Sequence, residues 1–133
     1  MQQVVPAKME YLDVLLDFIK QSIVSSSKDA ELSKPLQETI DTVQLVSDEI
    51  FSNIVKYASL PSDENVIVNI EICVNKITVE FRDNGQKFDP RQYKIPPPPR
   101  GGQNGIRMIK HLMDHHDYEY RNGQNIFTVS KNI

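Results

Sequence analysis

The chain has 133 residues, a formal net charge of −3 and 39% hydrophobic residues, which is ordinary for one globular domain. This charge gives no general attraction to nucleic acid or to an anionic membrane. No segment approaches the ~20 apolar residues of a membrane span, and the first residues lack a signal-peptide pattern. We therefore expect residues 1–133 to form a single cytoplasmic domain.

The first half of the chain predicts a short strand followed by two helices. The segment QQVVPA is rich in β-branched residues and is ended by Pro6, which favours an edge strand. Residues 9–26 carry apolar side chains at helical spacing. Pro35 suits the first turn of a second helix, with Ser33 or Lys34 near its cap, and this helix is expected to continue to Ala58.

The second half predicts strands, a long loop, one helix and a closing hairpin. Alternating apolar residues indicate two strands joined by a tight turn at Asn75-Lys76, and Asn122-Gly123 is a strong hairpin signal. The expected strands are 66–74, 76–83, 117–121 and 125–131, with a helix over 106–113. The order predicts an α+β fold, a two-layer sandwich of a mixed, mostly antiparallel sheet with helices on one face.

The single cysteine, Cys73, cannot form an internal disulfide, which fits a reducing compartment. It lies in the apolar segment VIVNIEICV. We expect a buried structural thiol, and a reactive thiol is the alternative.

One edge of the second predicted helix carries polar side chains beside the apolar stripe. At about 100° per residue, Val46 and Ile50 lie on the apolar side and Asn53 falls at its margin. Glu49 lies about 40° further round, and Lys56 about 20° beyond it. A solvated face with ordinary helical side-chain pairs is one interpretation of this edge. A pocket lined by these groups is the other.

Residues 84 to about 104 form a loop of a length that is uncommon in compact domains unless the loop is functional or disordered. It starts with Asp83-Asn84-Gly85, contains Pro96 to Pro99 and ends in a glycine-rich stretch before a helix. Because the loop has few apolar anchors, we expect it to be mobile without a ligand.

These residue types suit the binding of a purine nucleotide. Glycines before a helix let backbone N–H groups approach phosphates, and Arg100 adds positive charge there. Asp83 is an acceptor for an exocyclic amine, and Gly85 permits close approach of a flat ring. Asn53 offers an oxygen to Mg²⁺, and Glu49 is placed to accept a proton from an attacking hydroxyl.

Three segments together, DEIFSNIVKYA, RDNGQKFDP and RGGQNGIRMIKHLMD, resemble the GHKL ATPase superfamily, which has the Bergerat ATP-binding fold. They are most similar to its anti-sigma-factor serine/threonine kinase branch. The segments VVPAKMEYL, YEY and NGQNIFTVSK also fit the family pattern, so the resemblance covers nearly the whole chain.

The resemblance implies ATP and Mg²⁺ as cofactors and assigns a role to each site residue. Asn53 matches the Mg²⁺-binding asparagine and Glu49 the proposed general base. Asp83 matches the adenine-binding aspartate and Gly85 its glycine partner. The residues implied to contact the phosphates are Lys56, Gly101, Gly102 and Gly105, with Arg100 beside them.

The resemblance also implies a reaction and partners. In this branch the γ-phosphate of ATP passes to a serine or threonine of a STAS-type anti-anti-sigma protein. The kinase also captures a sigma factor or a similar regulator and commonly forms a homodimer. Two alternatives stay open: a module that binds ATP, Mg²⁺ and a partner with little phosphotransfer, and a detached histidine kinase catalytic domain. No dimerisation helix precedes the fold, which argues against the second alternative.

The chain departs from the family pattern at three places. Ile54 stands where relatives usually have alanine. Gln86-Lys87 stands where some relatives have a second glycine or a proline. Gln103 occupies the place of a lid glycine, unless one residue is inserted there. The changes in the loop and the lid put turnover in more doubt than nucleotide binding.

Overall fold

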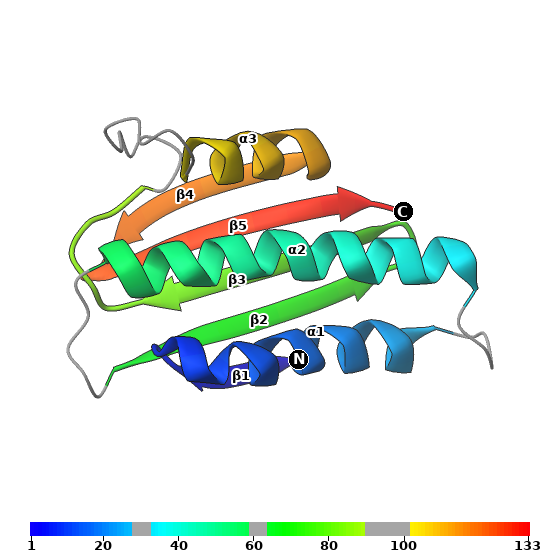
Figure 1. Cartoon of the computed structure of the whole chain (residues 1–133), viewed down its shortest axis with the longest axis horizontal. Helices are drawn as coiled ribbons and strands as arrows, with labels where there is room; N and C mark the ends of the chain where they lie inside the picture. Colours follow the sequence, from blue (N-terminus) through cyan, green and yellow to red (C-terminus); the bar gives the residue numbers. More distant parts are fainter. Residues whose placement is uncertain (28–32, 59–63, 90–101) are drawn as a thin grey trace.

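The computed structural model describes residues 1–27, 33–58, 64–89 and 102–133, with the side chains of 102–106 left out (Figure 1). The chain forms a strand, a short 3₁₀ helix and two α-helices, then a strand pair, a third helix and a second strand pair. The elements are β1 (Gln2–Pro6), η1 (Met9–Tyr11), α1 (Leu12–Ser26), α2 (Lys34–Tyr57), β2 (Asn65–Cys73), β3 (Lys76–Asp83), α3 (Gly102–Leu112), β4 (His115–Arg121) and β5 (Gln124–Asn132).

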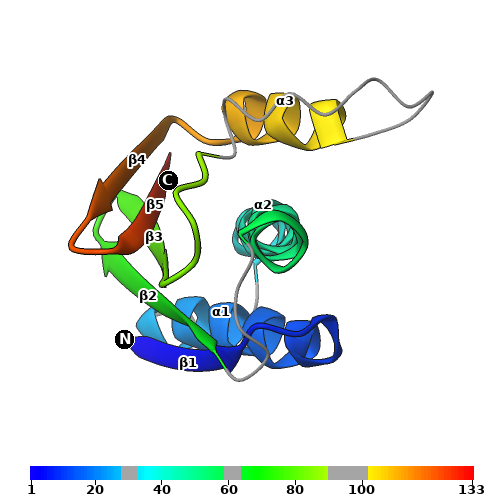
Figure 2. The same ribbon diagram turned by 90° about the vertical axis from the view of Figure 1, so that its left-hand side faces the viewer.

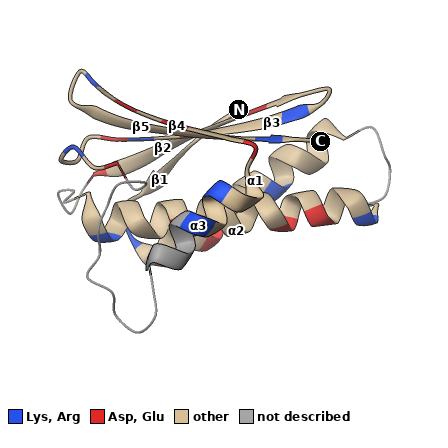
Figure 3. Ribbon diagram, turned by 90° about the horizontal axis from the view of Figure 1, so that it is seen from above, with Lys and Arg blue, Asp and Glu red and all other residues tan. Residues whose placement is uncertain are grey.

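The strands form one sheet in the order β1-β2-β3-β5-β4, with β1 at one edge as predicted. Every pairing among the described strands is antiparallel, so the sheet has no parallel component in this part of the chain. Figure 3 shows α1, α2 and α3 together on one face of this sheet. The predicted α+β two-layer sandwich is confirmed.

Strict alternation along β2 and β3 directs apolar side chains to the helix-covered face. Val68 and Ile70 on β2, and Val79 and Phe81 on β3, are fully buried. They pack in one cluster with the apolar side of α2, including Phe51. Because the pattern has a period of two, the last residue of β3 is also directed to this buried face.

The start of α2 follows the predicted cap. The Ser33 hydroxyl accepts a hydrogen bond from the Leu36 backbone N–H at 3.2 Å, and Pro35 lies in the first turn. Helix α3, by contrast, begins at Gly102 rather than at Ile106 as the apolar spacing predicts. The glycine-rich end of the predicted loop therefore belongs to the first turn of the helix.

Two tight turns connect the strand pairs. Asn122 and Gly123 have φ of 54° and 77°, the left-handed conformations that an Asn-Gly turn allows. The turn between β2 and β3 lies at Val74-Asn75, one residue earlier than predicted, because Lys76 already pairs with Cys73.

The expectation of a buried Cys73 thiol is wrong, because the residue is exposed. Core-facing positions on β2 end in Ile72, so the next residue lies on the other face of the sheet, against which none of the described helices packs. Among the described residues, no helix is both long enough and apolar enough to cross a membrane.

Candidate functional site

Asp83 is the last residue of β3 and continues the buried face of that strand. Its side chain is 3% exposed, and it occupies a position where the alternation along β3 predicts another apolar residue. Figure 2 looks onto this end of the molecule, where the segment after β3 runs between the sheet and the C-terminal end of α2. A carboxylate thus ends a strand that is otherwise apolar on this face.

The hydrogen bonds of Asp83 leave one carboxylate oxygen available. Oδ1 accepts from the Gly85 backbone N–H and from the Asn125 side-chain amide, each at 2.9 Å. Oδ2 accepts no hydrogen bond from the described residues. Burial raises the pKa of the Asp83 carboxyl above its usual value, and the two hydrogen bonds to Oδ1 partly oppose that rise.

Asn125 is a site residue that the sequence analysis did not single out. It lies directly opposite Asp83 in the β3–β5 pairing and is 3% exposed. Its side chain also contacts the loop after β3, by donating to the Gln86 carbonyl at 2.8 Å and accepting from the Phe88 N–H at 2.9 Å. Asn125 ends the segment NGQN, which matches the family pattern and is the feature of the sequence that could have indicated this residue.

Position 85 requires glycine because its backbone lies directly against the end of α2. A Cβ added there would lie 2.2 Å from the Ala58 carbonyl oxygen and 2.9 Å from Asp83 Oδ1. The Gln86 N–H donates to the same Ala58 carbonyl at 2.8 Å. The absence of a side chain thus serves loop packing on α2, and the predicted approach of a flat ring stays a prediction.

The loop after β3 is anchored over residues 84–89. Phe88 is buried, and its ring packs against Tyr57 in the last turn of α2 with the centroids 5.8 Å apart. The Phe88 N–H also donates to the Tyr118 hydroxyl on β4. The loop thus has an apolar anchor at Phe88, and its mobility without a ligand stays a prediction. Residues 90–101 lie outside the described part of the chain.

Asn53, Glu49 and Lys56 lie along one edge of α2 as predicted. Asn53 is 5% exposed, and its side-chain amide has no hydrogen-bond partner among the described residues. Glu49, one turn earlier, is partly exposed, and Lys56 is exposed. Because Ala58 contacts the loop after β3, this end of α2 and the end of β3 border the same region.

The predicted phosphate-binding residues are only partly described. Gly102 and Gly105 lie in the first turn of α3, where backbone N–H groups lack partners within the helix and favour an anion. Arg100 and Gly101 lie outside the described residues. The structure therefore assigns the two described glycines to a helix rather than to a loop.

The donor and acceptor groups of the described residues suit the binding of a nucleotide together with a divalent cation. Asp83 is a nearly buried residue whose Oδ2 accepts no hydrogen bond from the described residues, which suits the amino group of adenine. The nearly buried amide of Asn53 lacks a protein partner, which suits an oxygen ligand to Mg²⁺. Such polar groups are costly to bury unless something satisfies them.

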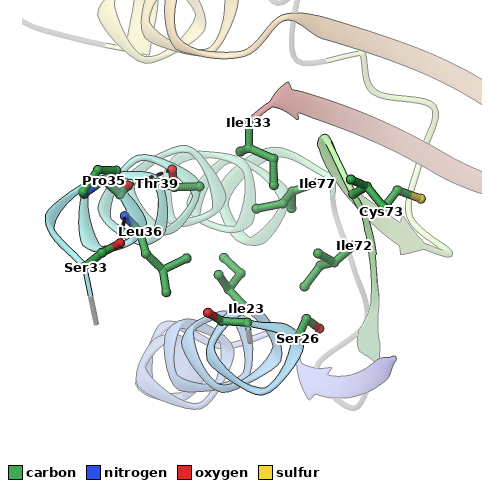
Figure 4. Close-up of a pocket in the computed structure, with 12 residues that line it drawn as sticks. Ile23, Ser26, Ser33, Pro35, Leu36, Thr39, Ile72, Cys73, Ile77 and Ile133 are labelled. Carbon is green, nitrogen blue, oxygen red and sulfur yellow. Dashed lines mark hydrogen bonds between the residues drawn. The ribbon is translucent and has the colours of Figure 1, made fainter. Parts of the chain in front are cut away.

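A pocket of about 650 Å³ opens at the opposite end of the molecule, between α1, the start of α2 and the β2–β3 hairpin. Its described lining is mostly apolar or hydroxylic, with Ile23, Leu36, Ile72 and Ile77 among the apolar residues and Cys73 at its edge (Figure 4). At 1.5 Å per residue along α2, Leu36 lies about 25 Å from Asn53. This pocket contributes none of the predicted site residues.

His111 at the end of α3 and His115 at the start of β4 have the i, i+4 spacing of helical metal ligands. His111 and His115 would share a helix face if the helix continued, but α3 ends at Leu112 and His115 begins β4. No group of three or more potential metal-ligating His, Cys, Asp or Glu side chains occurs in the described part of the chain.

Comparison with known proteins places this geometry in a family. The family described as histidine kinase-like ATPase domain matches residues 5–131. The chain is also 30% identical, over 96 residues, to serine/threonine-protein kinase BtrW of Bordetella bronchiseptica. That alignment covers 67% of this chain and 68% of BtrW.

Two solved structures share the fold. The RsbU and RsbW domains of a Mycobacterium tuberculosis protein match with a TM-score of 0.68 and 12% identity over 98% of this chain. This chain spans only 31% of that protein. The histidine kinase AdeS of Acinetobacter baumannii matches with a TM-score of 0.54 and 10% identity, over 99% of this chain and 67% of AdeS.

The family match spans almost the whole chain, and the alignment with BtrW covers about two thirds of each protein. The chain belongs to the histidine kinase-like ATPase (GHKL) family and is similar in sequence to a serine/threonine-protein kinase of that kind.

Proposed function

We propose that this protein binds Mg·ATP where the end of β3 meets the end of α2 and transfers the γ-phosphate to a serine or threonine of a STAS-type partner. The buried Asp83 carboxylate carries the proposal, because Oδ1 accepts two hydrogen bonds from the protein and Oδ2 accepts none from the described residues. A charge at that depth is costly without a ligand that uses it.

Adenine recognition follows from the free oxygen. Asp83 Oδ2 accepts a hydrogen bond from the exocyclic amine of adenine, and the opposite polarity of the guanine carbonyl disfavours guanine nucleotides. The ring of Phe88 packs against Tyr57 in the last turn of α2, which anchors the loop that follows Asp83.

The phosphates extend from adenine toward α2 and α3. Asn53 would hold Mg²⁺ through its side-chain oxygen, and the bound cation would offset the charge of the phosphate oxygens. Lys56 and the first-turn N–H groups of α3 at Gly102 and Gly105 supply positive potential for the same oxygens.

Glu49 serves as the general base for the transfer. The O–H bond of the partner's serine or threonine breaks as its oxygen forms a bond to the γ-phosphorus, and the proton passes to a Glu49 carboxylate oxygen. The bond between the γ-phosphorus and the bridging oxygen breaks, and ADP leaves. Partial exposure of Glu49 fits this role, since the hydroxyl arrives from another protein.

Phosphorylation of the partner is expected to release it and to free the kinase for a sigma factor or a similar regulator. Homodimer formation is part of the same proposal. The name of BtrW supports the kinase assignment, and the fold shared with an RsbW domain agrees with it.

The test is phosphotransfer from γ-labelled ATP to STAS proteins encoded beside this gene. We expect label on a serine or threonine of one STAS protein, and loss of label when that residue becomes alanine. The product should survive acid, as phosphoserine does and phosphohistidine does not. Labelled histidine, or no transfer with any such partner, would overturn the proposed reaction.

A second candidate function is an ATP-dependent binding module with little phosphotransfer. The departure of the glycine-rich segment favours it, because a glycine is lost at Gln103 or one residue is inserted there, and helix α3 already begins at Gly102. Retained Mg·ATP binding with no transfer to any STAS protein, together with ATP-dependent capture of a partner, would support this second function.

A further inference from the structure

We propose that Asn125 is the positioning residue that makes Asp83 selective for adenine. Its amide holds Asp83 Oδ1 so that only Oδ2 is presented to the base. This inference rests on the proposed ATP site and extends it to a residue on β5 that does not itself need to touch the nucleotide.

The orientation of the Asn125 amide is fixed by one neighbouring group that can only donate a hydrogen bond and one that can only accept one. The Phe88 backbone N–H can only donate, and it contacts Oδ1 at 2.9 Å. The Gln86 carbonyl can only accept, and it contacts Nδ2 at 2.8 Å. Nδ2 must therefore point toward Asp83, and it donates to Oδ1 at 2.9 Å.

The Tyr118 hydroxyl reinforces this orientation from the neighbouring strand. It donates to Asn125 Oδ1 and also accepts from the Phe88 N–H. Burial raises the pKa of the Tyr118 hydroxyl, so it stays protonated and remains a donor at neutral pH. Asn125 thus has a partner on each side, which leaves its amide little freedom to rotate.

Two consequences for base selection follow. First, Asp83 Oδ1 already accepts hydrogen bonds from the Asn125 amide and the Gly85 N–H, so the carboxylate cannot turn that oxygen toward the base. Second, donation from Asn125 stabilises the ionised form of Asp83 against its burial. A protonated Asp83 could donate a hydrogen bond to the guanine carbonyl. Discrimination against guanine therefore depends on Asn125.

The same amide couples base recognition to the loop. Asn125 contacts both Gln86 and Phe88, and the Gln86 N–H contacts the Ala58 carbonyl at the end of α2. A purely structural role would therefore also weaken nucleotide binding when Asn125 is replaced. The readout must separate the two roles.

The experiment compares ATP with purine riboside triphosphate, which lacks the exocyclic amine, by calorimetry. The wild type is expected to bind ATP more tightly by about 10- to 100-fold, the range for a hydrogen bond to a charged group. Asn125→Asp keeps the shape and the acceptor but loses the donor to Asp83. In that variant the preference for ATP should shrink to within about threefold, and GTP should compete better.

Asn125→Leu is the second variant, since two carboxylates side by side in Asn125→Asp could prevent folding. Gln124→Ala is the matched control, because this neighbouring amide contacts Asn84 at 3.1 Å and not Asp83, so the preference should persist. Thermal melting verifies that each protein is folded.

Three outcomes are decisive. A collapsed preference in either folded variant supports the proposal. Equal weakening of both nucleotides, with the preference intact, would show that Asn125 is only structural and would leave the ATP site standing. A wild type that binds both nucleotides equally would overturn the assignment of Asp83 and this inference with it.

Discussion

The two ends of α2 bury different kinds of side chain, and the difference separates packing from function. At its C-terminal end, Ala58 contacts the loop that follows Asp83, and the polar side chains of Asn53 and Asp83 are nearly inaccessible to solvent. At its N-terminal end, Leu36 borders an apolar pocket together with Ile77. Apolar burial stabilises the fold by itself, whereas buried polar groups lower stability unless they are satisfied.

The comparison teaches where a ligand is needed. The N-terminal end is complete as a packed core with an open pocket, and its lining has one titratable side chain, that of Cys73, among the described residues. The C-terminal end leaves Asp83 Oδ2 and the Asn53 amide without hydrogen-bond partners in the described part of the chain. We therefore expect substitutions at the two ends to separate stability from nucleotide binding.

The largest effect is expected from Glu49→Gln. This change keeps the shape of the side chain and removes only the base, so phosphotransfer should fall by about 10²- to 10⁴-fold. The dissociation constant for Mg·ATP should change little. Single-turnover kinetics with the labelled nucleotide, beside calorimetry, measure the two quantities. Wild-type transfer by this variant would remove Glu49 from the mechanism.

Ile77→Ala should affect stability and not binding. Ile77 is 1% exposed, and truncating such a side chain typically costs about 2–5 kcal/mol. Urea unfolding should show that loss, while ATP affinity measured below the transition stays at the wild-type value. Thr78→Ala, on the opposite face of the same strand, is the control and should cost about 1 kcal/mol or less. Weakened ATP binding in Ile77→Ala would mean that the two ends are coupled.

Asp83→Asn should give the reverse result. The amide oxygen can keep the hydrogen bonds from Gly85 and Asn125, but an N–H donor replaces the acceptor that adenine needs, so ATP affinity should fall about 10- to 100-fold. Since the folded-state pKa of Asp83 is raised, its contribution to stability is present at low pH and is lost as the pH rises through that pKa. The variant should lack this loss and be at least as stable as wild type at neutral pH.

ATP binding has the opposite dependence on pH, because it needs the ionised carboxylate. In the wild type, affinity should weaken as the pH falls through the raised pKa of Asp83. Calorimetry across the acidic range, with melting curves at each pH, tests both signs. Lower stability of Asp83→Asn at neutral pH would contradict the claim that this charge is kept for function.

Ser47→Ala should have the smallest effect. Ser47 is fully buried in the middle of α2, and its hydroxyl has no hydrogen-bond partner within the described residues. Removal of an unsatisfied hydroxyl should change the free energy of unfolding by about 1 kcal/mol or less, toward greater stability. ATP affinity should stay unchanged. A large loss of either quantity would show that Ser47 has a role outside simple packing.

Much of the fold could be predicted because its signals are local. The cap at Ser33, the period of two along β3 and the Asn122-Gly123 turn each depend on neighbours in sequence, and the structure confirms them. The exposure of Cys73 was predictable from the same period, since the odd positions of β2 face away from the helices. Apolar composition was the wrong guide there.

The site was predictable only in part, because its assembly depends on pairing between distant strands. Asp83 and Asn53 were selected from their segments, and the structure buries both. Asn125 lies 42 residues after Asp83, and only the β3–β5 register places it opposite. The early start of α3 at Gly102 was missed because glycine and polar residues give no apolar period to follow.

The most direct test of the central claim is a calorimetric titration of ATP into wild type and Asn53→Ala, each with and without Mg²⁺. The account predicts one site in the wild type with affinity that depends on Mg²⁺, and in Asn53→Ala a much weaker site that no longer responds to the cation. Thermal stability should stay within about 1 kcal/mol in the variant, because Asn53 lies outside the apolar stripe of α2. Equal affinity of both proteins, or a response to Mg²⁺ that survives the substitution, would contradict a nucleotide site at this end of α2.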